Sequence, residues 1–179
     1  SGILSAKLSA EKGLNTILID DKSYLGGSTI YQDDDIFKIN NETPNVWLKD
    51  QIEKLKKIPN LTIKNRTSVA AFHGYNYLLA RENLTDHLGV HERKEKIRQR
   101  LLKIRAKKVV IATGAIERPL IFSNNDRPGI ILSSSVKKYI DYYGVKTGEN
   151  ISLFTNNDSA YETAISLNKS GVKVKVIID

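Results

Sequence analysis

One short run of residues constrains the fold of this chain more than any other. Residues 107–112 read Lys-Lys-Val-Val-Ile-Ala, and Thr113 and Gly114 follow them directly. A continuous apolar run of this length, bounded by Gly and Pro, is typical of a strand buried on both faces. In open α/β sheets, nucleotides bind where such strands end. The sequence therefore predicts a buried strand over 107–112 and a nucleotide beside its closing turn, although an ordinary glycine turn would have the same local sequence.

The beginning of the chain favours the nucleotide-binding interpretation. Gly2 opens a helical pattern that ends at Gly13, and a strand over 16–20 then ends in the carboxylate of Asp20. This order is the second half of a dinucleotide-binding βαβ unit, in which Gly2 is the last glycine of G-x-G-x-x-G and Asp20 meets the ribose hydroxyls. We expect the first strand and the first two glycines upstream of Ser1, so that the chain is a fragment of a longer protein.

The acidic residue also discriminates between cofactors. A carboxylate at Asp20 accepts hydrogen bonds from a ribose diol but repels a 2′-phosphate, so NAD or FAD fits the first site and NADP fits poorly. The alternative for Gly2 and Asp20 is a plain helix start and a solvated strand end. Their spacing, taken together with the motif at 112–114, favours the nucleotide fold.

Composition narrows the remaining classes. The 179 residues, of which 40% are hydrophobic, suffice for one domain and part of another. No segment approaches the roughly 20 apolar residues of a membrane span, so we expect no membrane partner. The absence of cysteine rules out a C-x-x-C redox centre in this segment and fits a reducing, cytoplasmic location.

Much of the net charge of +8 comes from a basic run over 91–108. Charged and apolar residues alternate through 103–106, which predicts a half-exposed strand. Such a run is usually a solvated face, and no aromatic residues are interleaved for base stacking, so we expect no nucleic-acid binding. A basic surface that faces an acidic partner subunit is the alternative.

No metal site is expected either. His87 and His91 have the i, i+4 spacing that suits a metal on a helix, but Gly89 interrupts the segment and no third ligand is placed nearby. The acidic triplet at 33–35 lies in a polar, irregular stretch over 29–44 and is interpreted as a solvated loop.

The remaining patterns predict the order of the other elements. A helix is expected over 45–58 and another over 133–143. Short strands over 61–64, 68–73 and 77–81, with the basic strand, suggest a β-meander over about 61–108, in which a backbone amide of Val69 could face an adenine ring.

The end of the chain restarts a βαβ unit. A strand over 151–154, a helix over 159–169 and a strand over 172–179 are expected, but Thr155 and Asn157 stand where the first two glycines belong. Asn crowds a pyrophosphate, so this unit should keep the fold while binding a nucleotide weakly or not at all.

The predicted fold class is α/β, a Rossmann-like FAD/NAD(P)-binding fold with a parallel sheet, helices and an added β-meander. We expect this fragment to lack the first strand and part of the second βαβ domain. Residues 1–144 form the first dinucleotide-binding domain, and residues 145–179 begin a second, degenerate one.

These motifs resemble, in order, the alpha subunits of heterotetrameric sarcosine oxidases. The resemblance covers essentially the whole chain, and its last three motifs are specific. The motifs occupy residues 2–4, 17–21, 26–28, 98–101, 112–120, 124–129 and 154–161.

The resemblance implies an oxidoreductase that demethylates sarcosine to glycine with hydrogen peroxide and passes the one-carbon unit to tetrahydrofolate. It implies beta, gamma and delta subunits as partners, and FAD and FMN in the wider complex. The alpha subunit is expected to hold NAD in the first site, and this fragment is expected to contain no catalytic residue.

The cofactor-binding roles follow from the same resemblance. Gly2 is assigned to the pyrophosphate approach, Asp20 to ribose and Val69 to adenine. Asp21 takes the role of Asp20 if the strand ends one residue later. The neighbouring loop and the closing turn contribute Gly27, Ser28, Thr113 and Gly114.

Three functions are compatible with these residues. Beside the sarcosine oxidase subunit, an FAD-dependent NADH oxidoreductase or a related opine or amino-acid dehydrogenase subunit shares the architecture. A degenerate nucleotide fold retained as an assembly scaffold is the non-catalytic alternative. The ribose contact is common to NAD and FAD, so the sequence does not decide between them.

Overall fold

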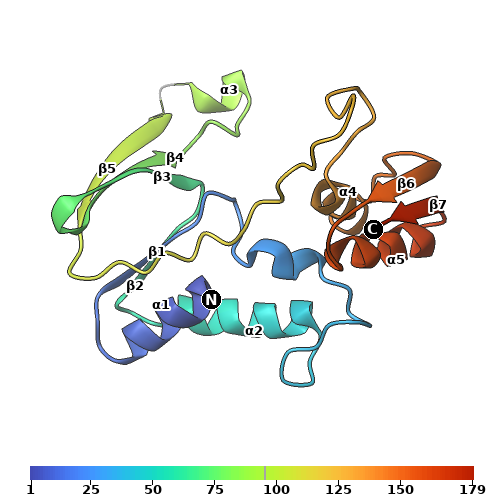
Figure 1. Cartoon of the computed structure of the whole chain (residues 1–179). Helices are drawn as coiled ribbons and strands as arrows, with labels where there is room; N and C mark the ends of the chain where they lie inside the picture. Colours follow the sequence, from blue (N-terminus) through green and yellow to red (C-terminus); the bar gives the residue numbers. More distant parts are fainter. Residues whose placement is uncertain (95) are drawn as a thin grey trace. The chain divides into compact units, whose positions relative to one another are not determined.

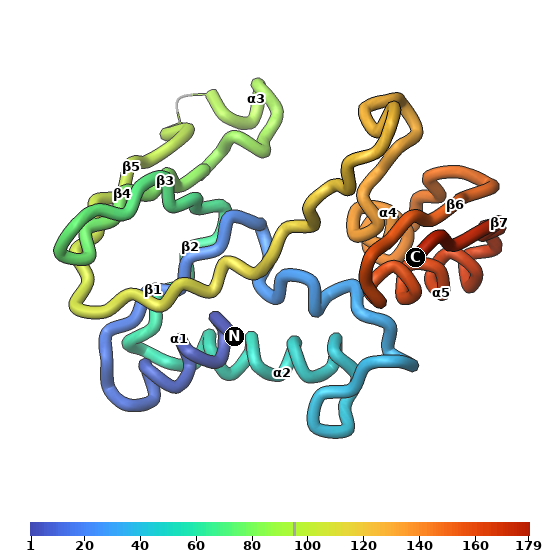
Figure 2. Tube along the Cα trace, viewed as in Figure 1, coloured from blue at the N-terminus to red at the C-terminus, as the bar shows by residue number. Residues whose placement is uncertain are grey.

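The structure, a computed structural model that describes residues 1–94 and 96–179, divides into two compact units (Figure 1). Unit 1 consists of Ser1–Gly27 and Val46–Thr113, and unit 2 of Ser28–Asn45 and Gly114–Asp179. The chain therefore leaves unit 1, returns to it and leaves again, a path that Figure 2 traces from blue to red. The domain division at residue 144, which rests on nucleotide-binding repeats, stays a prediction.

A helix and a parallel strand pair begin unit 1. Helix α1 (Gly2–Glu11) leads through Gly13, whose φ of +82° closes the helix, to β1 (Thr16–Ile19). Strand β1 pairs in parallel with β2 (Leu61–Lys64). Helix α2 (Pro44–Lys56) lies beside α1, and Lys7 Nζ donates to Gln51 Oε1 at 3.3 Å. All four elements agree with their predictions.

The predicted β-meander is confirmed. Strands β3 (Thr67–His73), β4 (Tyr77–Asn83) and β5 (Gln99–Arg105) form an antiparallel sheet in that order, with the turn η2 (Gly74–Asn76) and the short helix α3 (Val90–Arg93) as connections. The basic run supplies the edge strand β5, as its alternation indicated. Glu95, which belongs to the same run, lies outside the described residues.

The prediction of a buried strand over 107–112 is wrong. This segment pairs with no strand in the described parts of the chain, and Val110 and Ile111 are 66% and 70% exposed. A strand exists only where a neighbour bonds its N–H and C=O groups, and an apolar sequence alone does not supply that neighbour.

Unit 2 contains the second βαβ motif, as predicted. The parallel strands β6 (Asn150–Phe154) and β7 (Lys173–Ile178) are joined by α5 (Ser159–Lys169), which packs against α4 (Ser133–Asp141). A single-turn helix, η1 (Gly27–Tyr31), precedes the acidic loop. The core of the unit consists of Val136, Ile140, Leu153, Leu167 and Val172. Within the described residues, no helix combines the length and apolar character that crossing a bilayer requires.

Candidate dinucleotide site

Gly2 lies where three segments of unit 1 meet. A Cβ atom on this residue would stand 3.2 Å from the Cβ atom of Ala112 and 4.0 Å from Cδ1 of Leu18. Carbon atoms normally pack at about 3.5–4.0 Å, so a side chain here would push α1 away from the segment that precedes Thr113. The absence of a side chain is thus what lets helix, strand and turn approach one another closely.

Asp20 follows the last residue of β1, and the structure fixes its position through the backbone. Its N–H donates to the carbonyl of Lys64 at 3.0 Å, and its own carbonyl accepts from Thr67 N–H at 2.9 Å. The carboxylate is half-buried, and Oδ1 accepts from Lys22 N–H at 2.9 Å. Burial raises the pKa of the Asp20 carboxyl, the Lys22 hydrogen bond opposes this rise, and the nearby Asp21 charge adds to it.

Asp21 has a different environment. Its carboxylate forms an ion pair with Lys22 Nζ at 2.7 Å. The Asp21 side chain is 57% exposed and the Lys22 side chain 50%. Because β1 ends at Ile19, Asp20 and not Asp21 stands at the strand's carboxyl end. Asp21 is therefore a solvated surface residue in this structure.

Asn65 is a neighbour of Asp20 that the sequence analysis did not single out. The two residues follow the paired residues Ile19 and Lys64 at the carboxyl ends of β1 and β2. Asn65 Nδ2 donates to the carbonyl of Ser23 at 3.1 Å, whereas Asn65 Oδ1 is buried without a hydrogen-bond partner among the described residues. A buried acceptor without a donor is costly, so this oxygen is a strained feature at the end of β2. Only the strand pairing identifies this residue.

Val69 lies on β3, whose first residue bonds to Asp20. The β3–β4 register shifts between Val69 and Ala71, which marks a bulge, and the Val69 side chain is 45% exposed. Bulges often occur beside ligand sites because they redirect a side chain and leave backbone groups unpaired. The structure thus brings Asp20 to the strand that carries Val69, and Gly2 to the residue before Thr113.

The other four candidates lie in loops. Thr113 is exposed and closes unit 1, and Gly114, with a φ of +75°, begins unit 2. Gly27 has a φ of +56° and is exposed, as is Ser28, the first residue of unit 2. Positive φ at Gly27 and Gly114 is the backbone conformation for which glycine is preferred. The expected turns are therefore present at both places.

Glu117 is a second residue whose contacts no sequence motif predicts. Its Oε1 accepts from Ser133 N–H at 3.1 Å and its Oε2 from Ser134 N–H at 2.7 Å. A carboxylate on the free N–H groups at a helix N-terminus satisfies those donors and complements the helix dipole. Glu117 thereby fixes the loop after Gly114 to α4. A contact over 16 residues through an irregular loop has no local sequence signal.

In the loop of the second βαβ motif, side chains form hydrogen bonds with the backbone of the same loop. Asn157 Oδ1 accepts from Ser159 N–H at 3.0 Å and from Ser159 Oγ at 2.5 Å, while Thr155 Oγ1 accepts from Asn157 N–H at 3.1 Å. In a dinucleotide site these N–H groups face the pyrophosphate. Here the side chains of Thr155 and Asn157, which replace the glycines, already accept hydrogen bonds from these N–H groups.

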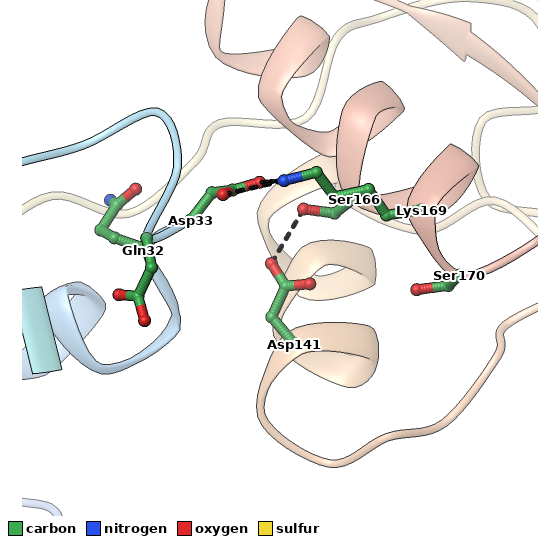
Figure 3. Close-up of a pocket in the computed structure, with 7 residues that line it drawn as sticks. Gln32, Asp33, Asp141, Ser166, Lys169 and Ser170 are labelled. Carbon is green, nitrogen blue, oxygen red and sulfur yellow. Dashed lines mark hydrogen bonds and ion pairs between the residues drawn. The ribbon is translucent and has the colours of Figure 1, made fainter. Parts of the chain in front are cut away.

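A shallow pocket of about 250 Å³ lies in unit 2 (Figure 3). Lys169 Nζ donates to Asp33 Oδ1 at 3.0 Å and to Asp35 Oδ2 at 2.7 Å, and Ser166 Oγ donates to Asp141 Oδ2 at 3.0 Å. Residues 33–35 lie in a loop outside the helices and strands, with Asp34 and Asp35 exposed as expected, and Lys169 pairs with two of the three carboxylates. Lys169 and these two carboxylates satisfy one another, so they form a structural contact. In the described parts of the chain, no cluster of His, Asp and Glu is placed to hold a metal.

Comparisons with known proteins place the whole chain beside one kind of subunit. It is 36% identical over 177 residues to the sarcosine oxidase subunit alpha of Corynebacterium sp. (strain P-1), and 33% identical over 179 residues to that of Rhizobium meliloti (strain 1021). These matches cover 99% and 100% of the chain but 18% of each relative. The resemblance found in the motifs is thus confirmed, and the chain spans under a fifth of its relatives' length.

The fold occurs in solved structures. The crystal structure of L-proline dehydrogenase from P. horikoshii superposes with a TM-score of 0.74 and 24% sequence identity, over 99% of this chain and 33% of that one. The predicted α/β fold class is confirmed by this match. No protein-family model matches the chain.

Proposed function

We propose that this chain is the dinucleotide-binding part of an oxidoreductase alpha subunit of the sarcosine oxidase type. The similarity to such subunits over the full chain supports this role. The whole protein would then demethylate sarcosine oxidatively to glycine with hydrogen peroxide and pass the one-carbon unit to tetrahydrofolate. Beta, gamma and delta subunits would complete the complex, and FAD and FMN would reside elsewhere in it. This segment itself would contribute no catalytic residue.

The observation that carries the proposal is the pair of acceptors at the ends of β1 and β2. Asp20 Oδ2 receives no hydrogen bond from a described residue, and neither does the buried Asn65 Oδ1. The two residues follow the carboxyl ends of paired parallel strands, where the ribose of a dinucleotide binds. A half-buried carboxylate with a raised pKa also gains most from new donors, because they replace the water that burial removed.

The other candidate residues would let the dinucleotide approach the backbone and would form the loops around it. Gly2 would let the pyrophosphate reach the first turn of α1, where free N–H groups and the helix dipole favour an anion. Val69 would offer its backbone to the adenine ring. Gly27 and Ser28 would form the neighbouring loop, and Thr113 and Gly114 the closing turn. We assign NAD to this site, with FAD as the alternative, since both carry the same ribose.

The alternative is a self-contained FAD-dependent NADH oxidoreductase, or a related opine or amino-acid dehydrogenase subunit. Such an enzyme needs a second functional nucleotide loop. The hydrogen bonds of Asn157 and Thr155 within the β6–α5 loop count against it, because they occupy the groups that would bind a second pyrophosphate.

The test uses the full-length protein purified with whatever subunits accompany it. The sample is denatured and the released dinucleotide is identified by mass. We expect NAD, with flavin only when another subunit is present, whereas FAD bound to the full-length chain alone would refute the assignment.

Two variants localise the site. Asp20→Asn removes a charged acceptor of the ribose hydroxyls and should weaken NAD binding about 10- to 100-fold, since hydrogen bonds to charged groups contribute about 1.5–3 kcal/mol. Asp21→Asn is the matched control, because its solvated carboxylate pairs with Lys22, and should change affinity less than about twofold. Equal effects of the two substitutions would exclude Asp20 as the ribose ligand.

A further inference from the structure

One face of the β-meander carries cations and no carboxylate. In β4, Leu78, Ala80 and Glu82 are buried, and the alternate residues point to the opposite face. On that face four β4 residues are each paired with one of β5, and two of the four pairs combine a cation with an aliphatic side chain. Beyond the polar Asn83–Gln99 pair lies the part that we call the cationic face, which comprises Tyr77, Leu79, Arg81, Leu101, Lys103 and Arg105.

The three cations of this face are unpaired. Arg81, Lys103 and Arg105 are exposed, and none forms an ion pair with a described residue. Glu82 is the one carboxylate in the three strands, and it lies on the other face. There it accepts from Lys64 Nζ at 2.9 Å and lies 3.6 Å from Arg100. The cationic face therefore has a positive potential that the meander does not neutralise.

The face also offers apolar and pre-positioned contacts. Leu101 is 61% exposed between cations, and the Arg105 guanidinium lies 5.4 Å from the centre of the Tyr77 ring. Stacking on that ring holds Arg105 in one place, which lowers the entropy lost when it binds a carboxylate. Tyr75, in the adjoining turn, is 92% exposed. Arginine and tyrosine, together with tryptophan, are enriched among the residues that contribute most binding energy at protein interfaces.

We propose that the cationic face docks a carboxylate-rich surface of another subunit in the assembled oxidoreductase. This inference rests on the proposed function, which supplies the partner. Alternating cationic and aliphatic side chains suit a protein surface of acidic residues around an apolar centre. A nucleic acid fits less well, because three cations are few for a phosphate backbone and Arg105 covers the Tyr77 ring that would stack on a base.

The first experiment measures proximity in the complex as purified. A carbodiimide, which joins an amine directly to a carboxylate in contact with it, is added, and the linked peptides are sequenced by mass spectrometry. We expect Lys103 linked to Asp or Glu of another subunit. Lys56, exposed on α2, is the matched control. Acetylation of Lys103 by an N-hydroxysuccinimide ester as fast as that of Lys56 would refute the proposal.

The second experiment reverses the charge. Arg81→Glu, Lys103→Glu and Arg105→Glu combined in the full-length chain should weaken subunit association about 10- to 1000-fold, because like charges then face each other across the interface. The control combines Lys49→Glu, Lys56→Glu and Lys57→Glu, which change the net charge equally on exposed lysines outside the meander, and should alter association less than about twofold. Unchanged association of the first variant would overturn the proposal.

Two further readouts separate the alternatives. The dinucleotide released from each sample is identified by mass, so loss of the partner with NAD retained supports the docking proposal independently of the cofactor site. A chain without NAD whose association still depends on the cationic face would refute the NAD assignment, and the docking proposal would stand on the subunit role alone. Tight binding of a fluorescent 20-mer of deoxythymidine, lost in the charge-reversal variant, would instead assign the face to nucleic acid and refute protein docking.

Discussion

Gly2 approaches Ala112 so closely that a Cβ atom on Gly2 would stand 3.2 Å from the Cβ atom of Ala112. We expect Gly2→Ala to loosen the first turn of α1 by about 1–3 kcal/mol, as added methyl groups do in tightly packed sites. Hydrogen exchange of the α1 amides measures this effect. Gly74→Ala is the control, because a Cβ atom there meets nothing within 4 Å. If the α1 amides exchange equally slowly in both variants, the helix can shift to accommodate the added methyl group without loss of stability.

Asp20→Asn should stabilise the unliganded protein while it weakens dinucleotide binding. Burial raises the pKa of Asp20 above its usual 3.8, so the charged form is disfavoured in the folded state. The stability contributed by this group is fully present below pH 3.8 and is lost as the pH rises through the raised pKa. Urea unfolding should therefore show a gain for the variant at neutral pH that vanishes below pH 3.8. A variant less stable than the parent at neutral pH would contradict this sign.

Removal of the Glu117 carboxylate should release the loop that follows Gly114. Glu117→Ala leaves the N–H groups of Ser133 and Ser134 without their acceptors, and loss of a helix cap costs about 0.5–2 kcal/mol. The expected result is faster hydrogen exchange in the first turn of α4 and faster proteolysis of residues 115–132. Glu149→Ala, on an exposed residue of the same unit, should leave both rates unchanged.

Lys169→Met should free the acidic loop. The Lys169 ammonium lowers the pKa of Asp33, and the two carboxylates raise the pKa of Lys169 to about 12. The Asp33 contribution is present above pH 3.8 and is lost as the pH falls through the lowered pKa. The Lys169 contribution is present below pH 10.5 and is lost as the pH rises through about 12.

Protease protection of residues 32–36 should therefore stay constant between pH 3.8 and 10.5 and disappear in Lys169→Met. Lys175→Met, which alters an exposed lysine on β7, serves as the control. Protection that survives in Lys169→Met would mean that the backbone of the loop, and not the ion pairs, holds it.

Asn157→Ala should destabilise α5 without creating a nucleotide site. The variant leaves Ser159 N–H without the acceptor that Asn157 Oδ1 provides, at a cost of about 1 kcal/mol. Asn157→Gly combined with Thr155→Gly removes both side chains that occupy the loop and should raise its affinity for inorganic pyrophosphate. Isothermal calorimetry on the full-length protein measures this. If the double variant binds pyrophosphate no more tightly than the parent, the hydrogen bonds within the loop are not what prevents binding there.

The sequence predicts the elements whose periodicity is local. Alternation in the basic run indicated β5, and the apolar spacing of residues 159–169 indicated α5, because each pattern reports the two faces of one element. The segment over 107–112 shows the limit of this reasoning. Its apolar character describes an environment, but a strand also requires a partner, and a partner is not encoded in the run itself.

The contacts that fix the candidate sites were less predictable. Asp20 could be identified from its separation from Gly2 along the sequence, because that spacing belongs to one motif. Asn65 could not, since it becomes a neighbour of Asp20 only through the register of β1 and β2. The Lys169–Asp33 contact joins residues 136 positions apart, and many lysines and carboxylates of this chain could have formed such a pair.

The contact between Lys169 and Asp33 also sets the order in which the chain can mature during translation. Unit 1 contains no residue beyond Thr113, whereas the acidic loop meets its counter-ion only after α5 has been made. At about 5–20 residues per second, the ribosome needs several seconds to cover that interval. For that time Asp33 and Asp35 lack the lysine that pairs with them in the folded chain. The acidic loop of nascent unit 2 therefore lacks its contact with α5 until residue 169 has been synthesised.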